Sequence, residues 1–334
     1  MVVTRRRALM LAGALGAGLL TAGCSDPTPG APDTKLTIGL TYVPNVQFAP
    51  FYLAVQQGYF TEAGVDVTLR HHGDSEDLFG ALTGGREQIV VAGGDEMLQA
   101  RAQGTDVISV ATMYQTYPVV LIVPEGSDIT APEHLAGRTV GIPGPYGETY
   151  FGLLAMLKAA GLTEADLTIS NIGYTQQAAL SGGHVDAVMG YVNNDVPQFR
   201  ATGLAVSAVG IGDVPLVGIG LGTTSRVTQQ SAAGLRGVIE AVGRAVADIA
   251  ADPNLAVEAA SEEIPGTITD EQRAIMTSVA EATVPLYGDL TQTWGQQDPE
   301  RWQAMSTTML ELGLIESEVD ATTAFTNDFL ATVD

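Results

Sequence analysis

The chain has 334 residues, with 38 Asp or Glu against 15 Lys or Arg, so its formal net charge is −23. An acidic surface of this kind repels phosphate backbones, and we expect no nucleic-acid partner. Hydrophobic residues make up 46%, enough for a full-sized core in one large or two medium domains. The single cysteine, Cys24, rules out an intramolecular disulfide, a cysteine-cluster zinc site and a cysteine-ligated iron–sulfur cluster.

The first 24 residues are typical of an export signal. A basic stretch at 5–7 precedes an apolar run at 8–20, which is too short to span a bilayer comfortably, and small residues at 21–23 lead to Cys24. The segment resembles a bacterial lipoprotein signal, in which the cysteine carries the lipid after cleavage. We therefore predict a signal peptide over 1–24, lipidation of Cys24 and a lipid-anchored location at the extracytoplasmic face of the cell membrane. An uncleaved anchor is the alternative, and the arginines leave Sec and twin-arginine export both open.

Residues 25–34, SDPTPGAPDT, are rich in Pro, Gly and polar side chains. This composition is typical of a flexible tether. No later stretch reaches about 18 uninterrupted apolar residues, so we expect no transmembrane helix in the body.

The body that follows alternates strand and helix patterns. Strands are predicted at 36–40, 65–69, 89–92 and 107–112, and helices between them at 49–58, 78–82 and 96–103. The rhythm restarts with strands at 139–142, 167–172, 185–189 and 204–209, and helices at 149–160, 176–181 and 195–201. Each set predicts a parallel sheet with helices on both faces. Two such sets indicate two α/β lobes.

After residue 228 the pattern becomes helical only. Helices are predicted at 232–251, 254–262, 270–281, 299–312 and 322–331. Two apolar stretches, 117–124 and 215–224, lie between the lobe patterns. We interpret them as strands that pass from one lobe to the other and form a two-segment hinge, which would let the lobes close on a ligand. Two ordinary core strands are the other interpretation.

Several motifs resemble one family. They are YVPNVQFAPFY at 42–52, QGYF at 57–60, GVDV at 64–67, LAGRTVG at 135–141 and VDA at 185–187. Together they resemble the SsuA/THI5-like (NMT1/THI5) family over about 35–224. The resemblance implies an α/β, type II periplasmic-binding-protein fold, with lobe 1 from 35–122 and 220–334 and lobe 2 from 123–219.

The same resemblance implies a function. Most bacterial members of the family are solute-binding subunits of ABC importers, so a small-molecule ligand and an ABC permease with its ATPase are the implied partners. The form of the 42–52 motif is similar to the vitamin and vitamin-precursor branch, which takes thiamine pyrimidine precursors or riboflavin. A sulfonate or taurine receptor is an alternative. We expect a monomer.

The family also contains thiamine pyrimidine synthases, which consume pyridoxal phosphate and one of their own histidines, with iron. That chemistry needs a lysine and a histidine after the third strand and a cysteine-rich iron segment. The matching segments here, 92–98 and 217–224, contain no Lys or His and no Cys respectively. We therefore expect no cofactor and no enzyme activity, and keep a synthase as the alternative.

Ligands of open α/β sheets bind beyond the carboxyl ends of the strands. That rule selects six loops, whose candidate ligand-binding residues are Tyr42, Asn45, Gln47, Phe48, Asp95, Tyr114, Tyr117, Gly144, Tyr146, Gly147, Tyr174, Tyr191 and Asn193. In each loop the competing interpretation is a helix cap or ordinary packing.

Six of the ten tyrosines lie in these loops or at the lobe junction. A tyrosine combines a stacking face with a hydrogen-bonding hydroxyl, and an aromatic pair adds about 0.5–1.5 kcal/mol beyond area burial. This distribution favours a flat heterocycle. The loop at 141–149 opens a helix, where free N–H groups bind anions or carbonyl oxygens. Because Glu148 adds negative charge there with no Lys or Arg nearby in the sequence, a neutral polar ligand is favoured over a dianion.

No metal site is expected. His71 and His72 are neighbours in a strand pattern, so their side chains point to opposite faces and do not share an ion. No Ser-His-Asp arrangement or carboxylate pair marks a catalytic site.

Overall fold

The computed structural model describes residues 35–73, 76–292 and 294–331. The predicted signal peptide, the tether and the lipidation of Cys24 lie outside these residues. Within the part described, no helix has both the length and the apolar character needed to cross a membrane.

The first sheet has five strands in the order β2-β1-β3-β10-β4. Its members are β1 (Lys35–Leu40), β2 (Asp66–His71), β3 (Ile89–Gly93), β4 (Ile108–Thr112) and β10 (Ile219–Thr223). β1 pairs in parallel with β2 and β3, whereas β10 runs antiparallel to β3 and β4. The sheet is therefore mixed, and the expectation of a purely parallel sheet is wrong for one strand.

The second sheet repeats this plan in the order β7-β6-β8-β5-β9. It contains β5 (Val119–Pro124), β6 (Thr139–Ile142), β7 (Thr168–Asn171), β8 (Ala187–Tyr191) and β9 (Val206–Gly210), with β5 antiparallel to both neighbours. Each sheet takes its antiparallel strand from the chain just after it has left the other sheet, β5 following β4 and β10 following β9. β5 and β10 each enter their sheet from the end opposite to the one at which the neighbouring strands begin. They therefore run antiparallel to those neighbours.

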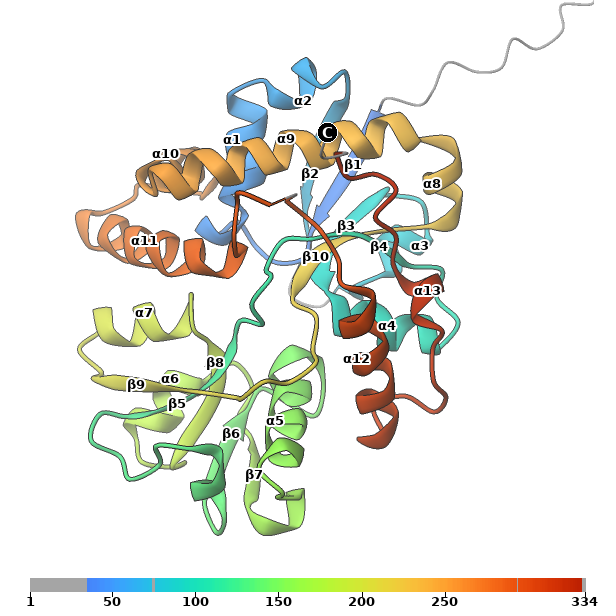
Figure 1. The fold of residues 1–334 in the computed structure, drawn as a ribbon. Coiled ribbons are helices and arrows are strands. Elements are labelled where there is room, and N and C mark those ends of the chain that lie inside the picture. Colours follow the sequence, from blue (N-terminus) through green and yellow to red (C-terminus); the bar gives the residue numbers. More distant parts are fainter. Residues whose placement is uncertain (1–34, 74–75, 293, 332–334) are drawn as a thin grey trace, which may run out of the picture. The chain divides into compact units, whose positions relative to one another are not determined.

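Two segments, 113–118 and 211–218, connect the sheets (Figure 1). The apolar stretches predicted as crossings at 117–124 and 215–224 are mostly strand, because β5 begins at Val119 and β10 at Ile219. All of β5 pairs within the second sheet. The lobe boundaries at 122/123 and 219/220 stay predictions; here lobe 1 means the first sheet with its helices, and lobe 2 the second.

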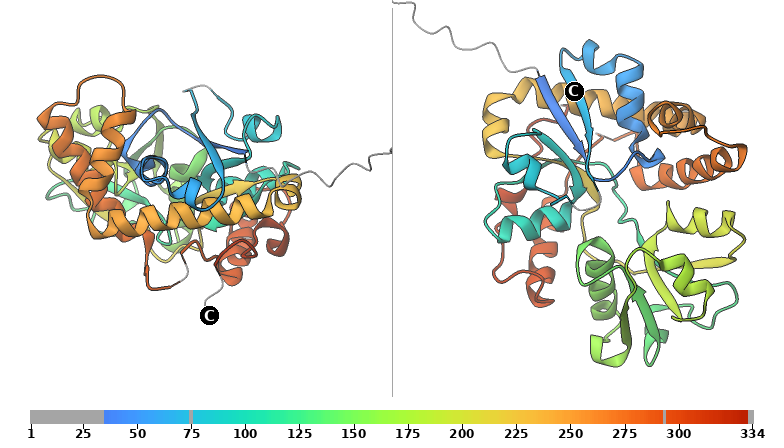
Figure 2. Two further views of the ribbon diagram at one scale, coloured as in Figure 1. Left: turned by 90° about the horizontal axis from the view of Figure 1, so that it is seen from above. Right: turned by 180° about the vertical axis from the view of Figure 1, so that it is seen from behind.

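Helices cover the first sheet. They are α1 (Ala49–Gln56), α2 (Tyr59–Glu62), α3 (Gly80–Thr83), α4 (Gly94–Ala102), α8 (Ser225–Gln230), α9 (Ala232–Ala251), α10 (Asn254–Glu263) and α11 (Asp270–Thr283). In α9, buried apolar side chains recur every three or four residues, from Leu235 and Val238 to Val242 and Ile249, and they join the core cluster of the first sheet. Figure 2 shows α9 lying across this sheet. The apolar residues whose spacing predicted this helix are thus the ones that pack it against the core of the first sheet.

The second sheet carries α5 (Gly147–Ala159), α6 (Gln176–Ser181) and α7 (Asp195–Ala201). Late in the chain, α12 (Pro299–Glu311) buries Trp302 and Met305 in the core cluster of lobe 2. The guanidinium of Arg301 donates to the carbonyl oxygens of Val214 and Leu216, both at 2.9 Å. α12 therefore supports the second crossing segment.

The predicted helix at 322–331 is wrong. A single turn, α13 (Ala321–Ala324), ends before Phe325, which is extended and bridges to Ser109 of β4. The Thr326 N–H donates to the Ser109 carbonyl oxygen at 2.9 Å. Hydrogen bonding to an exposed strand edge satisfies backbone groups that a helix would have satisfied internally.

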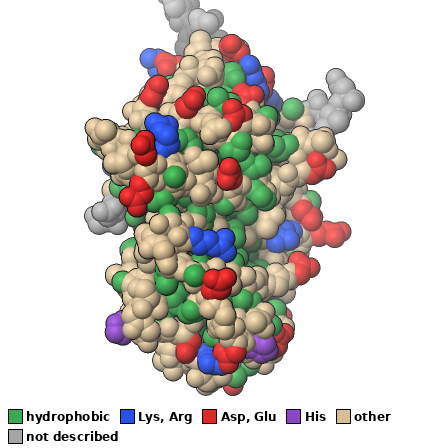
Figure 3. Space-filling view, turned by 90° about the vertical axis from the view of Figure 1, so that its left-hand side faces the viewer, with side chains coloured by type: hydrophobic (Ala, Val, Ile, Leu, Met, Phe, Trp, Pro, Cys, Tyr) green, Lys and Arg blue, Asp and Glu red, His purple; other side chains and the backbone are tan. Residues whose placement is uncertain are grey.

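Acidic side chains are dispersed over the face of the molecule shown in Figure 3, with fewer basic ones between them. The excess of acidic residues in the composition is thus spread over this surface and does not form one patch.

Candidate functional site

Four of the six loops chosen from the sequence meet between the two sheets. We call this region the lobe junction and define it as residues 93–96, 113–118, 143–148 and 191–194. It combines the start of α4 after β3, the first crossing segment, the start of α5 after β6, and the loop after β8. Strand-end loops of both lobes therefore supply it, as the rule for open sheets predicts.

Three carboxyl groups, Asp95 and Glu96 of α4 and Glu148 of α5, form what we call the acidic cluster. Asp95 is 0% exposed and Glu148 4% exposed. Both lie against Gly93, where an added Cβ would come within 2.5 Å of Asp95 Oδ1 and 2.9 Å of Glu148 Oε1. Carboxyls from opposite lobes thus pack against one glycine that has no room for a side chain.

Two tyrosine hydroxyls hold the acidic cluster. Tyr117 donates to Asp95 Oδ2 at 2.6 Å, and its hydroxyl oxygen lies 3.0 Å from the Glu148 carbonyl oxygen. Tyr191 donates to Glu148 Oε2 at 2.8 Å. The other carboxylate oxygen, Glu148 Oε1, is buried and has no hydrogen-bond partner among the described residues. Asp95 is fully bonded, since its Oδ1 also accepts from the Glu96 N–H at 2.8 Å.

The electrostatics follow from burial. Burial raises the pKa of Asp95 to about 8, and the charge of Glu96 adds to the rise, against the hydrogen bonds from Tyr117 and from backbone N–H groups. Burial, followed by the charges of Asp95 and Glu96, raises the pKa of Glu148 well above its usual range. The pKa of Glu96 is also raised by burial. The acidic cluster therefore retains protons at pH values where exposed carboxyls have lost them.

Asn193 forms a second buried polar point. Its Nδ2 donates to Thr283 Oγ1 at 3.0 Å and lies 3.5 Å from the Tyr114 hydroxyl. Its Oδ1 is buried with no hydrogen-bond partner among the described residues. The Tyr114 ring in turn packs on Tyr287, with centroids 5.8 Å apart. Sequence reasoning missed Thr283 because it ends α11, far from any strand-end loop.

Three tyrosines predicted as ligand contacts are exposed: Tyr42 by 50%, Tyr146 by 53% and Tyr174 by 75%. We call them the exposed tyrosines. The pKa of Tyr174 is raised by partial burial first, then by a hydrogen bond with Tyr146 and by the charges of Tyr42 and Glu96. The three rings therefore share one neighbourhood, although Tyr42 follows β1 of lobe 1 and the other two belong to lobe 2.

Gly144 explains how Tyr146 is placed. A Cβ added at Gly144 would lie 2.3 Å from Cε1 of the Tyr146 ring. The ring therefore lies directly over this glycine, and any side chain there would displace it. Gly147 adopts φ +70°, which glycine reaches without strain, and an added Cβ would lie 3.5 Å from Glu96 Oε1.

The loop after β1 is fixed by a histidine. His71 Nδ1 lies 2.8 Å from the Tyr42 carbonyl oxygen and so donates to it, which leaves Nε2 to accept from the Tyr52 hydroxyl at 3.0 Å. Phe48 meets the imidazole edge-on, at 5.7 Å between centroids. His71 therefore positions the loop that carries Tyr42, a role that its sequence position did not reveal.

The remaining predicted residues divide between capping and packing. Asn45 Oδ1 accepts from the Gln47 N–H at 3.0 Å, so Asn45 caps the short 3₁₀ helix η1 (Val46–Phe48). A helix cap was the alternative to ligand contact that the sequence offered for this loop. His72 points away from His71 and bonds Glu87 at 3.0 Å. Within the described residues, no group of three or more His, Cys, Asp or Glu side chains is arranged to hold a metal ion.

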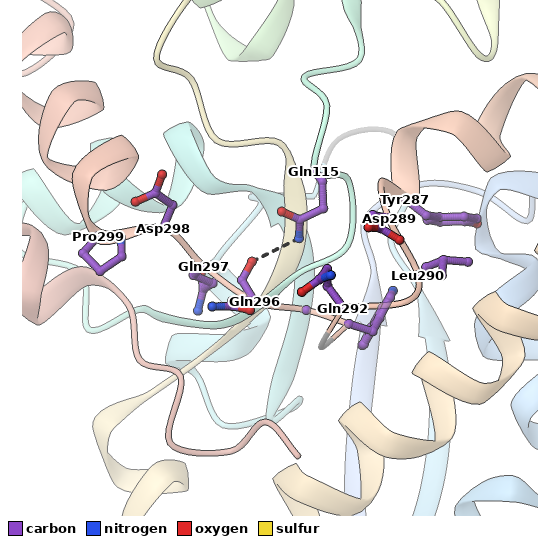
Figure 4. A pocket seen from close by; sticks show the side chains of 11 residues that line it. Gln115, Tyr287, Asp289, Leu290, Gln292, Gln296, Gln297, Asp298 and Pro299 are labelled. Atoms are coloured by element: carbon purple, nitrogen blue, oxygen red, sulfur yellow. Dashed lines mark hydrogen bonds between the residues drawn. The ribbon is translucent and has the colours of Figure 1, made fainter. Parts of the chain in front are cut away.

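A cavity of about 400 Å³ lies at one border of the lobe junction, lined by Gln115 and by residues of the segments 287–292 and 294–299 (Figure 4). Gln115 Nε2 donates to the Gln296 carbonyl oxygen at 3.1 Å and so connects two segments that line the cavity. None of the thirteen predicted ligand-binding residues lines it.

The lobe junction is chemically one-sided. In the part of the chain that the structure describes, the hydrogen-bonding and charged partners of the acidic cluster are carboxyls, tyrosines and backbone groups, with no Lys or Arg. Such a site offers no cationic side chain to a phosphate or sulfonate group. It suits a ligand with N–H or O–H donors and a flat ring.

Two mixed five-stranded sheets, joined by two crossing segments and covered by helices, define the type II periplasmic-binding-protein fold. The chain belongs to the NMT1/THI5-like family, and the match covers residues 45–256. The family and the fold predicted from the sequence are thereby confirmed.

The chain is similar to several individual proteins with assigned functions. The riboflavin-binding protein RibY of Chloroflexus aurantiacus is 31% identical, over 93% of this chain and 95% of its own. The formylaminopyrimidine-binding protein of Halalkalibacterium halodurans is 28% identical, over 57% and 58%. The 4-amino-5-hydroxymethyl-2-methylpyrimidine phosphate synthase of Legionella pneumophila is 23% identical, over 89% and 92%. In fold, the chain is similar to the periplasmic aliphatic sulphonate binding protein SsuA of Escherichia coli, with a TM-score of 0.70 at 18% identity over 88% and 92%.

Proposed function

We propose that this chain is the extracytoplasmic solute-binding protein of an ABC importer. It captures a small aromatic heterocycle, riboflavin or a thiamine pyrimidine precursor, between its lobes and delivers it to a permease. Lipidation at Cys24 holds it at the membrane. The relatives that bind riboflavin and formylaminopyrimidine support this ligand class.

One observation carries the proposal: exposed tyrosines from both lobes share a neighbourhood beside the acidic cluster. Rings from opposite lobes can both stack on a flat ligand only in the closed arrangement of the lobes. The ligand then binds the closed arrangement better than the open one, and this difference in affinity is what drives closure.

The charge of the lobe junction separates this function from that of a sulfonate receptor. The fold is shared with SsuA, but fold alone does not determine the ligand. A sulfonate is a permanent anion and needs cationic or N–H donors, whereas Asp95, Glu96 and Glu148 gather here with no described Lys or Arg partner. Taurine is therefore a poor ligand.

The synthase alternative is weakened by the residues present. Residues 92–98 carry no Lys or His, and 217–224 carry no Cys. In the structure, the first segment forms the end of β3 and the start of α4, and its acidic residues are engaged in the acidic cluster. Nothing in it offers an amine to pyridoxal phosphate.

Titration with riboflavin tests the proposal directly, since stacking on tyrosine quenches flavin fluorescence. Calorimetry with hydroxymethylpyrimidine and its formylamino analogue covers the second ligand class, and taurine serves as the negative ligand. Tyr174→Leu should weaken binding at least about fivefold through lost stacking, while Tyr150→Leu on α5, whose hydroxyl bonds Glu164 away from the predicted ligand residues, should not. No heat or melting shift with any flat heterocycle, tight binding of taurine, or a transformed product after incubation would refute the proposal.

A further inference from the structure

The N-termini of α4 and α5 converge at the lobe junction, and the chain's own carboxyls occupy that of α4. Such N-termini offer free N–H groups and a partial positive charge that favours bound anions. At α4 the Gly93 N–H donates to Glu96 Oε2 at 3.1 Å, and the Glu96 N–H donates to Asp95 Oδ1 at 2.8 Å. An anionic ligand group would have to compete with carboxyls that are already in place.

Glu148 differs from the other two members of the acidic cluster. It does not cap its own helix, because the hydroxyl of Tyr191 is the one partner that the described residues give its carboxyl, through Oε2. Oε1 is buried and has no partner among them. A buried carboxyl oxygen without a donor is unfavourable, so a ligand group that donates to it gains from the contact.

We propose that Glu148 sets the selectivity of the ligand site: Oε1 accepts from an N–H or O–H group of an uncharged or cationic ligand, and the groups around its carboxyl offer no cation to a phosphate or sulfonate. This inference rests on the proposed function and adds to it the residue that decides between related ligands. Tyr191 acts as a positioning residue, because its hydroxyl fixes the orientation of the Glu148 carboxyl.

The groups that face Glu148 reinforce its effect. Asp95 and Glu96 of α4 oppose it, Tyr117 comes from the first crossing segment and Tyr191 from the end of β8. These described neighbours bring no positive charge to a bound anion. A phosphate bound here would leave water without gaining a cationic partner, which lowers its affinity by roughly a hundredfold, whereas the amide of Glu148→Gln supplies an N–H donor.

The experiment compares ligands that differ only by a phosphate: riboflavin against flavin mononucleotide, and 4-amino-5-hydroxymethyl-2-methylpyrimidine against its phosphate. Dissociation constants are measured at pH 7.5 for the wild type, for Glu148→Gln and for the matched control Glu133→Gln, an exposed glutamate of the same lobe. The wild type and the control should both prefer the unphosphorylated ligand more than tenfold. Glu148→Gln should lower that preference at least tenfold while keeping the shape of the side chain.

A preference that stays within twofold of the wild type in a folded Glu148→Gln protein would overturn the inference and leave the proposed function intact. Equal binding of both ligands by the wild type would overturn it too. If no member of either pair binds the wild type, the proposed function fails and the inference fails with it. Circular dichroism verifies folding; should Glu148→Gln not fold, Glu96→Gln must shift the preference in the same direction.

Discussion

The buried carboxyl of Asp95 predicts a stability that falls as pH rises. Its pKa is about 8 in the folded chain, because burial and the charge of Glu96 raise it, against 3.8 as the ordinary value. Between these two pH values the folded state holds one proton that the unfolded state has released. The free energy of unfolding therefore decreases with rising pH across this window, and the full contribution is present only below about pH 4.

The magnitude follows from proton linkage. One proton difference changes the free energy of unfolding by about 1.4 kcal/mol per pH unit, and allowing for partial titration near pH 8, Asp95 accounts for about 1 kcal/mol between pH 6.5 and 7.5. Glu96 and Glu148 act in the same direction because their pKa values are also raised. Asp195, whose pKa burial raises to about 6, has finished titrating for the most part below this range.

The perturbation is Asp95→Asn, which removes the titrating group and keeps the side-chain volume. Urea unfolding followed by tryptophan fluorescence, with Trp302 fully buried, gives the free energy of unfolding at pH 6.5, 7.0 and 7.5. The wild type should lose at least about 1 kcal/mol over this range, and the variant should lose about 1 kcal/mol less than the wild type. Asp213→Asn is the control, since it makes the same chemical change on an exposed side chain. An Asp95→Asn slope equal to that of the wild type would refute the reasoning, whatever the absolute stability of the variant.

Two further substitutions address single contacts. Tyr117→Phe leaves Asp95 Oδ2 without its donor and should lower the free energy of unfolding by about 1–3 kcal/mol. Tyr150→Phe removes only an exposed hydrogen bond to Glu164 and should lower it by less than about 0.5 kcal/mol. Equal effects in urea unfolding would contradict the assigned contact of Tyr117. Gly144→Ala should push the Tyr146 ring from its place and weaken heterocycle binding at least about fivefold, whereas Gly210→Ala, where an added Cβ meets nothing within 4 Å, should leave it unchanged. Calorimetric titration of both glycine variants decides, and unaltered affinity in Gly144→Ala would contradict the role of Tyr146.

Most elements were predictable because each depends on a local pattern. Buried runs such as 36–40 and 89–92 became β1 and β3, and the stripe of α9 was visible at 232–251. The antiparallel direction of β5 and β10 was not predictable, since it depends on which sheet the chain re-enters. The same holds for 322–331, where pairing with a distant strand outweighs helix propensity.

The candidate site was predictable as a set of loops and not as a set of contacts. The loops selected from the sequence contain Tyr117, Glu148 and Tyr191, but Glu148 was considered only as added negative charge, and nothing indicated that these side chains would hydrogen-bond. His71 was considered only as a metal ligand, although its two ring nitrogens bridge Tyr42 and Tyr52. Side-chain partnerships between segments distant in sequence depend on the packed fold and leave no local pattern in the sequence.

The acidic cluster connects stability with ligand binding. Its carboxyls come from α4 of lobe 1 and α5 of lobe 2 and meet at Gly93, so moving the lobes apart relieves both their repulsion and their loss of hydration. The contact between the lobes is therefore weakened at the place where the ligand is proposed to bind. A ligand that supplies a donor to Glu148 Oε1 and rings to the exposed tyrosines offsets this repulsion only in the closed arrangement, and an anionic ligand increases it. The buried carboxyls that lower the stability of the chain at neutral pH are then the same groups that make closure depend on the right ligand.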